Sequence, residues 1–160
     1  MQNSIFNFHL NKKIISLFLS FVQYPKTMEH FVQSLPSSIR LNSKNMTVIV
    51  MGNESCDLDS AVSSIVFAHF LSQQNPSKTV IPLLNVLRDE LPLKTEVIHC
   101  LQTKLGLQVS DLVCRDDFPL ENLENFEMVL VDHHALTGKD VQFTKKAKLL
   151  LSMISSLSIR

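Results

Sequence analysis

Carboxylate and imidazole side chains lie in three short stretches of this chain. They occupy residues 53–59 (NESCDLD), 115–117 (RDD) and 132–134 (DHH). Hard divalent cations prefer carboxylate oxygen, and imidazole nitrogen shifts the preference from calcium towards manganese, cobalt, iron or zinc. Two such ions about 3.5–4 Å apart can hold a nucleophilic water and clamp a phosphoryl group. A fold that brings the three stretches together would therefore form a metal site suited to phosphoryl chemistry.

The first two stretches also have a structural interpretation that needs no metal. Asp57 or Asp59 could cap the N-terminus of a helix, where the helix dipole favours a carboxylate. The acids at 116–117 precede a Phe-Pro pair and could form an ordinary turn. Adjacent histidines point to opposite sides of an extended chain, so one of the pair at 133–134 could face a metal and the other a substrate. The metal hypothesis depends on convergence of the three stretches rather than on one motif.

The elements that must position these stretches follow from the apolar pattern. Apolar spacing predicts a helix over residues 61–71, and a second helix carries the stripe Val97, Leu101 and Leu105 and ends at Gly106. Four apolar runs have the length of strands buried on both faces: residues 47–51, 80–84, 112–114 and 128–131.

This order of elements predicts an α/β fold, a doubly wound and mainly parallel sheet flanked by helices. In such sheets, ligands bind at the loops that leave the carboxyl ends of the strands. Each of the three polar stretches follows a predicted strand. We therefore expect all three at the same edge of the sheet.

Composition restricts the class of protein. The chain has 160 residues, 45% of them hydrophobic. Its formal net charge is zero, so it has no overall positive charge that would attract nucleic acid. Three cysteines without CxxC spacing indicate no disulfide framework, and no apolar run reaches the roughly 20 residues of a membrane span. Residues 54–140 nevertheless carry fourteen acids against six bases. We expect a cytoplasmic protein that binds neither nucleic acid nor membrane.

Residues 1–45 are interpreted as a leader of uncertain structure. An apolar run over 14–22 follows two lysines, as in a signal peptide, but no small-x-small cleavage site follows it. We therefore favour a leader from an alternative start, with Met28 as an internal initiator. A short helix is expected over 29–35, before a proline.

Longer segments around the polar stretches resemble a known family. The segments VMGNESCDLDSAVSS, PLLNVLRDELPLKTEV, CRDD and VLVDHHAL are similar to the prune branch of the DHH phosphoesterase superfamily, which is grouped with exopolyphosphatases and manganese-type inorganic pyrophosphatases. The resemblance covers about residues 29–140. It implies that 46–140 form the N-terminal part of a DHH domain and that 141–160 are a divergent tail, in which we expect one more helix.

The resemblance implies a site for two divalent ions, manganese first and magnesium or cobalt as alternatives. Asp57 and Asp59 match the acids that bind one metal each. Asp116 matches the acid that bridges the metals, and Asp117 is a close competitor for that role.

The third stretch and two outlying residues complete the implied site. His133 matches a metal-binding imidazole, and His134 matches the catalytic imidazole that faces the substrate phosphate. Asp132 is either a metal ligand or the acid that orients the histidines. Asn53 stands where the pyrophosphatases carry a metal-binding histidine and is a substrate-binding candidate, which implies an altered first metal site. Arg88 is a candidate phosphate contact.

Three hypotheses follow. The first is a metal-dependent phosphohydrolase acting on phosphoanhydrides, either short-chain polyphosphate or pyrophosphate. The family has a fourth metal-bridging aspartate and a smaller C-terminal domain beyond the DHH stretch, and we find neither in this sequence, so we expect weak or no turnover. The alternative is a non-catalytic prune-like module that binds regulatory protein partners. The third is a poorly folded fragment with an exposed sheet edge.

Overall fold

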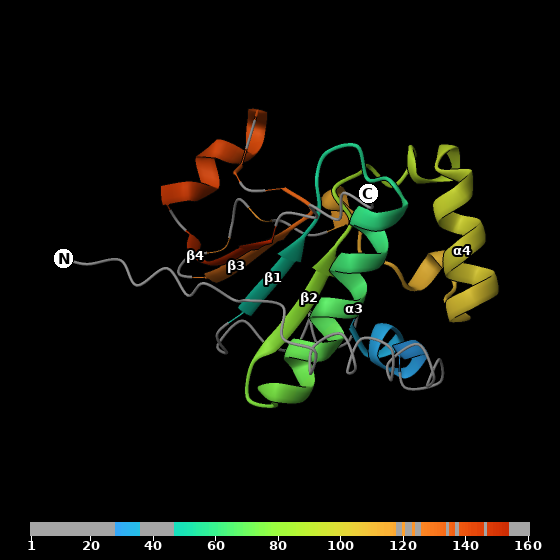
Figure 1. Ribbon diagram of the computed structural model, residues 1–160, viewed down its shortest axis with the longest axis horizontal. Helices are drawn as coiled ribbons and strands as arrows, with labels where there is room; N and C mark the ends of the chain where they lie inside the picture. The colour runs from blue at the N-terminus through green and yellow to red at the C-terminus, as the bar shows by residue number, and fades with distance from the viewer. Residues whose placement is uncertain are drawn as a thin grey trace, which may run out of the picture.

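The fold is a parallel sheet with helices packed against it (Figure 1). A computed structural model of the chain describes residues 28–35, 47–117, 120, 123, 126–133, 135–136, 138–145 and 147–153. The four strands run parallel in the order β2-β1-β3-β4. They are β1 (Thr47–Met51), β2 (Thr79–Leu83), β3 (Phe126–Val131) and β4 (Ala147–Met153). The predicted α/β doubly wound class is confirmed.

Sheet residues alternate between two apolar clusters. Ile49 and Met51 of β1 belong to one cluster, together with buried residues of helix 28–35 and of both longer helices. Val48 and Val50 belong to the other, against which Phe67 packs. Every residue of β2 and β3 is buried. Burial on both faces explains why apolar residues follow one another in these strands rather than alternate with polar ones. Glu127 of β3 is an exception, and it is paired with Lys78.

Helix α3 (Leu58–Gln74) connects β1 to β2 and lies against both strands (Figure 1). It begins three residues before the predicted start at 61. The Asp57 carboxylate caps it, since Oδ1 accepts a hydrogen bond from the backbone N–H of Ser60 at 3.3 Å. Residues 58–60 therefore belong to the first turn of the helix, and the Asn75 N–H closes the last turn on the carbonyl of Leu71.

Helix α4 (Thr95–Leu105) follows the short 3₁₀ turn Leu91–Leu93. It buries the predicted stripe of Val97, Leu101 and Leu105. Gly106 follows with φ of 69°, the left-handed conformation that glycine adopts without strain. Both the stripe and the stop signal are confirmed.

Two expectations about elements were wrong. Residues 112–114 form no strand: a single parallel bridge joins Leu84 to Cys114, because 3₁₀ turns at Val109–Asp111 and Arg115–Asp117 leave no length for a ladder. The expected helix in the tail is instead the 3₁₀ segment Gly138–Lys145 followed by β4. Strand β4 pairs with β3, and this pairing provides backbone hydrogen bonds for both strands. The apolar spacing within the tail gives no information about such a distant pairing partner.

The short helix expected near the N-terminus is confirmed over residues 28–35, where Met28, Val32 and Leu35 are buried at helical spacing. The rest of the predicted leader 1–45, residues 1–27 and 36–45, lies outside the described residues. Within the part of the chain that the structure describes, no helix has the length and apolarity to cross a membrane.

Candidate metal centre

Three carboxylates from two of the predicted stretches meet at the carboxyl edge of the sheet. Asp57, Asp59 and Asp132 each place one oxygen within 4.8 Å of the others. Asp57 is the N-cap of α3, Asp59 lies in the first turn of that helix, and Asp132 directly follows β3. Because β1 and β3 are parallel neighbours with Met51 opposite Leu130, their outgoing loops start side by side. Convergence of these two stretches is therefore observed.

The charges of this group suit a cation. The pKa of Asp59 is raised by partial desolvation, by a hydrogen bond with the Asp57 carboxyl and by the negative charges of Asp132 and Asp57. Carboxylates at this spacing destabilise one another's ionised form. A divalent ion would relieve that repulsion, and three oxygen donors are the ligand set that hard cations take. The residues present fit a metal of the kind that the family resemblance implies.

Asn53 holds one carboxylate of the group. Its Nδ2 donates a hydrogen bond to Oδ2 of Asp132, which lies 79 residues further along the chain. Its Oδ1 accepts from the backbone N–H groups of Ser55 at 3.0 Å and Cys56 at 3.2 Å. Both ends of the amide are thus engaged within the protein. In this structure Asn53 orients Asp132 and the loop after β1.

The backbone around the group is in unusual conformations. Asp132 has φ of 61° and Cys56 has φ of 45°, the left-handed region that non-glycine residues seldom adopt. At Gly52, an added Cβ would lie 2.0 Å from the Oγ of Ser60, which accepts the Asn53 N–H at 2.8 Å. Only glycine allows this close approach between the end of β1 and the start of α3. Strain of this kind is concentrated at functional sites.

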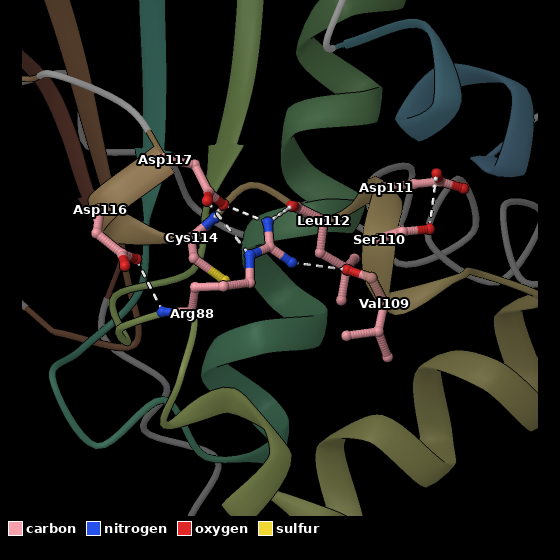
Figure 2. Close-up of polar contacts among 8 residues, drawn as sticks. All are labelled: Arg88, Val109, Ser110, Asp111, Leu112, Cys114, Asp116 and Asp117. Carbon is pink, nitrogen blue, oxygen red and sulfur yellow. Dashed lines mark hydrogen bonds and ion pairs between the residues drawn. The ribbon is translucent and has the colours of Figure 1, made fainter.

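The acids of the second stretch organise a neighbouring loop (Figure 2). The Asp116 carboxylate accepts a hydrogen bond from the backbone N–H of Arg88 at 2.8 Å. The Asp117 carboxylate accepts a hydrogen bond from the backbone N–H of Cys114 at 2.7 Å and forms an ion pair with the Arg88 guanidinium. That guanidinium also donates to the carbonyls of Val109 and Leu112. Among the described residues, neither acid is part of the three-carboxylate group. A metal role for Asp116 and a phosphate contact by Arg88 stay predictions.

The structure describes only one of the two histidines of the third stretch. His133 places Nδ1 2.9 Å from the carbonyl oxygen of Val131. Since a carbonyl can only accept, Nδ1 carries the proton in this contact, and Nε2 is left as the nitrogen with a lone pair for a metal. His134 lies outside the described residues, so its catalytic and substrate roles stay predictions.

Sequence reasoning missed a buried polar network at the same edge of the sheet. It consists of Asn85, Arg115 and Asp140, whose side chains contact one another. Asp140 is only 2% exposed. No local pattern separates this acid from a surface carboxylate, because its partners lie 25 and 55 residues earlier in the chain.

An open hollow lies next to the carboxylate group, between the first turn of α3 and helix α4. Its lining combines acids with apolar side chains: Asp57, Leu58, Asp59, Val62, Glu96 and Cys100. The carboxylates of α3 are therefore accessible to solvent and to a small molecule from this side.

Comparison with known proteins identifies relatives. Human exopolyphosphatase PRUNE1 is 36% identical to this chain over 117 residues, which are 71% of this chain and 25% of that protein. A putative exopolyphosphatase of Schizosaccharomyces pombe is 38% identical over 96 residues, 58% of this chain and 24% of that protein. The resemblance to the prune branch is confirmed over this stretch. Prune-type similarity extends to mouse protein prune homolog 2, 32% identical over 118 residues, which are 71% of this chain and 4% of that protein.

The chain spans about a quarter of the length of the exopolyphosphatases that it matches. No protein-family model matches the chain, and no solved structure matches it significantly.

Proposed function

We propose that this chain is the metal-binding part of a phosphohydrolase that cleaves phosphoanhydrides, with short-chain polyphosphate and pyrophosphate as substrates. The observation that carries the proposal is the convergence of Asp57, Asp59 and Asp132 at the carboxyl edge of a parallel sheet. The names of the exopolyphosphatase relatives support it, since they match this chain over 117 and 96 residues at 36% and 38% identity.

The proposed roles of the residues follow from their positions. Asp57 and Asp59 are assigned to one divalent ion each and Asp116 to the position that bridges the two ions. Asp132 and His133 are further ligands, and manganese is the preferred ion. A bound divalent ion supplies an activated water at neutral pH and charge neutralisation for the phosphate oxygens.

The remaining work falls to the protein. Asn53 keeps Asp132 aimed at the group through its amide hydrogen bond. His134 is assigned to the substrate phosphate, where an imidazolium would stabilise the charge of the transition state.

A non-catalytic module that binds regulatory proteins is the second candidate. The engagement of Arg88 by Asp117 and two carbonyls favours it, because in this structure that cation is used within the chain. This candidate predicts metal binding without turnover. Recovery of a defined partner by a folded, inactive chain would support it.

Hydrolysis of pyrophosphate and tripolyphosphate with and without Mn²⁺ tests the proposal. Asp57→Asn is the informative variant, since the amide oxygen of an asparagine still caps α3 but carries no negative charge for a metal. The exposed Asp89→Asn is its matched control. We expect weak but metal-dependent release of phosphate by the wild type and by the control, and release no faster than the metal-free background in Asp57→Asn. Equal turnover by all three proteins would refute the assignment.

A further inference from the structure

An ion pair between a partly buried guanidinium and a buried carboxylate joins two loops at the carboxyl edge of the sheet. Arg115 donates to Asp140 through both terminal nitrogens, with Nη1 3.1 Å from Oδ2. Arg115 also donates to the Oδ1 of Asn85 at 2.8 Å, and the Asn85 Nδ2 lies 3.3 Å from the Oδ2 of Asp140. The side chain of Asp140 is 2% exposed and that of Arg115 is 21% exposed. The three side chains form a closed triangle of hydrogen bonds.

This triangle is attached to the carboxylate group through the backbone. The Nδ2 of Asn85 lies within 3.4 Å of the carbonyl of Gly52, and the next residue is the Asn53 that holds Asp132. Arg115 directly precedes Asp116. Asp140 belongs to the 3₁₀ segment that follows the DHH stretch. The triangle therefore ties together the loops that follow β1, β2 and β3.

Burial makes the arrangement specific. A buried ion pair adds little net stability, because desolvation of the charges offsets their attraction, but removing one partner leaves an uncompensated charge. A fully satisfied polar network instead fixes one geometry. The group that needs a fixed geometry at this edge is the set of carboxylates.

We propose that Asn85, Arg115 and Asp140 form a positioning clamp that sets the loop carrying Asn53 and the loop carrying Asp116 relative to the metal ligands. The clamp rests on the proposed function for its purpose, the binding of a metal. Its mechanical part, the fixing of the two loops, is independent of any metal. The three residues are positioning residues, since they act through Gly52, Asn53 and Asp116.

The test is hydrogen exchange of the metal-free chain, with Asp140→Asn compared to Glu127→Gln. Glu127 is a matched control: it is a buried carboxylate paired with Lys78 at 2.5 Å, at the opposite end of the sheet. The reporters are the amides of Asn53, bonded to Ser60 Oγ, and of Arg88, bonded to Asp116. We expect both amides to exchange at least about tenfold faster in Asp140→Asn and to be unchanged in Glu127→Gln.

Asn85→Ala provides a second variant that keeps the Arg115–Asp140 pair. It is expected to accelerate exchange at Asn53 and leave the Arg88 amide as in the wild type. The clamp is refuted if Asn53 stays as protected as in the wild type in both variants, or if Glu127→Gln accelerates it equally.

Mn²⁺ affinity of the same proteins separates the clamp from the proposed function. A Kd raised by about 10–100-fold in Asp140→Asn and unchanged in Glu127→Gln supports both. Loosened loops in a chain whose wild type binds no Mn²⁺ would support the clamp and overturn the proposed metal function. An unchanged Kd despite loosened loops would overturn the link between clamp and metal site.

Discussion

At the scale of single residues, Asn53 determines how the acidic group is arranged. Its amide donates to Asp132 and accepts from two backbone N–H groups of the loop after β1. An aspartate here would add a fourth negative charge, whereas the amide contributes both a donor and an acceptor. Asn53 therefore links two segments of the site without increasing the repulsion among the carboxylates.

Replacement of Asn53 by alanine tests this role. We expect Asn53→Ala to weaken Mn²⁺ binding by about 10–100-fold, because Asp132 loses its orienting donor. The free energy of unfolding should fall by about 1 kcal/mol. Asn75→Ala, which removes a side-chain hydrogen bond to Leu71 at the far end of α3, is the control and should leave the affinity unchanged. Equal affinities in both variants, measured by calorimetry, would contradict the role.

We expect the thiols of Cys56 and Cys114, near the site, to be unreactive. Burial raises the pKa of Cys56 to about 11 and that of Cys114 to about 12, and both side chains are at most 1% exposed. At neutral pH almost no thiolate is present, and the thiolate is the nucleophile. We expect iodoacetamide to modify Cys100 first in the native chain, and all three cysteines after denaturation. Modification of native Cys56 at the rate of Cys100, detected by mass spectrometry, would contradict this.

At the scale of elements, the junction of β1 with α3 carries the site. Gly52 ends the strand, and Asp57 caps the helix five residues later. Asn53 precedes the cap in the intervening loop, and Asp59 follows it in the first turn of α3. A close contact between Gly52 and Ser60 fixes the angle at which the chain enters the helix.

The contact at Gly52 predicts a measurable cost for a single methyl group. Gly52→Ala should destabilise the fold by about 1–3 kcal/mol, because the new Cβ overlaps the Ser60 hydroxyl. The double variant Gly52→Ala/Ser60→Ala should lose less than the sum of the two single changes, since the overlap with Oγ is then gone. Urea unfolding of the four proteins measures the coupling. Strict additivity would show that the contact is not limiting.

The local pattern predicted elements whose signals lie within one segment. The runs at β1 and β3, the stripe of α4 and the stop at Gly106 all have such signals. The amphipathic pattern of the tail predicts a helix, but the segment forms the strand β4 because it pairs with β3. A pairing partner that is distant in sequence leaves no local signal. Residues 112–114 have strand composition but lie between two 3₁₀ turns, so composition alone gave the wrong element.

The candidate site shows the same division. Asp57, Asp59 and Asp132 could be predicted together because each follows a strand, and parallel strands deliver their loops to one edge. The turn interpretation of the acids at 116–117 also describes what their side chains do in the structure. The Asn85–Arg115–Asp140 clamp could not be predicted, because its hydrogen bonds join residues from three loops.

At the scale of the whole molecule, stability should depend on pH through His69. This histidine of α3 is 2% exposed, its ring lies 5.2 Å from that of Phe31, and burial lowers its pKa below the ordinary value of 6.5. Below that value the unfolded chain binds a proton that the folded chain does not. The free energy of unfolding therefore falls as the pH drops below about 6.5. Above about pH 6.5 the titration of His69 does not change it.

Chemical unfolding between about pH 7.5 and 5.5 tests this dependence. The wild type and the exposed-site control His99→Gln should both lose stability towards pH 5.5, and His69→Phe should lose less. The same slope in all three proteins would assign the effect to other groups.

The distribution of charge agrees with a metal-binding edge. Residues 54–140 carry fourteen of the fifteen acids, and the fold places three of them within contact distance of a single ion. The chain matches about a quarter of the length of its exopolyphosphatase relatives, so the metal site is the part of the proposed function that this chain can be tested for directly.

Calorimetric titration of the chain with Mn²⁺ is that test, with Asp59→Asn as the variant and Asp111→Asn as the control. Asp59 belongs to the three-carboxylate group, whereas Asp111 lies in a 3₁₀ turn and contacts Ser110. The account predicts saturable binding by the wild type and the control, and a loss of at least about tenfold in affinity in Asp59→Asn. Absence of binding by a chain that unfolds cooperatively, or equal affinity in all three proteins, would contradict it.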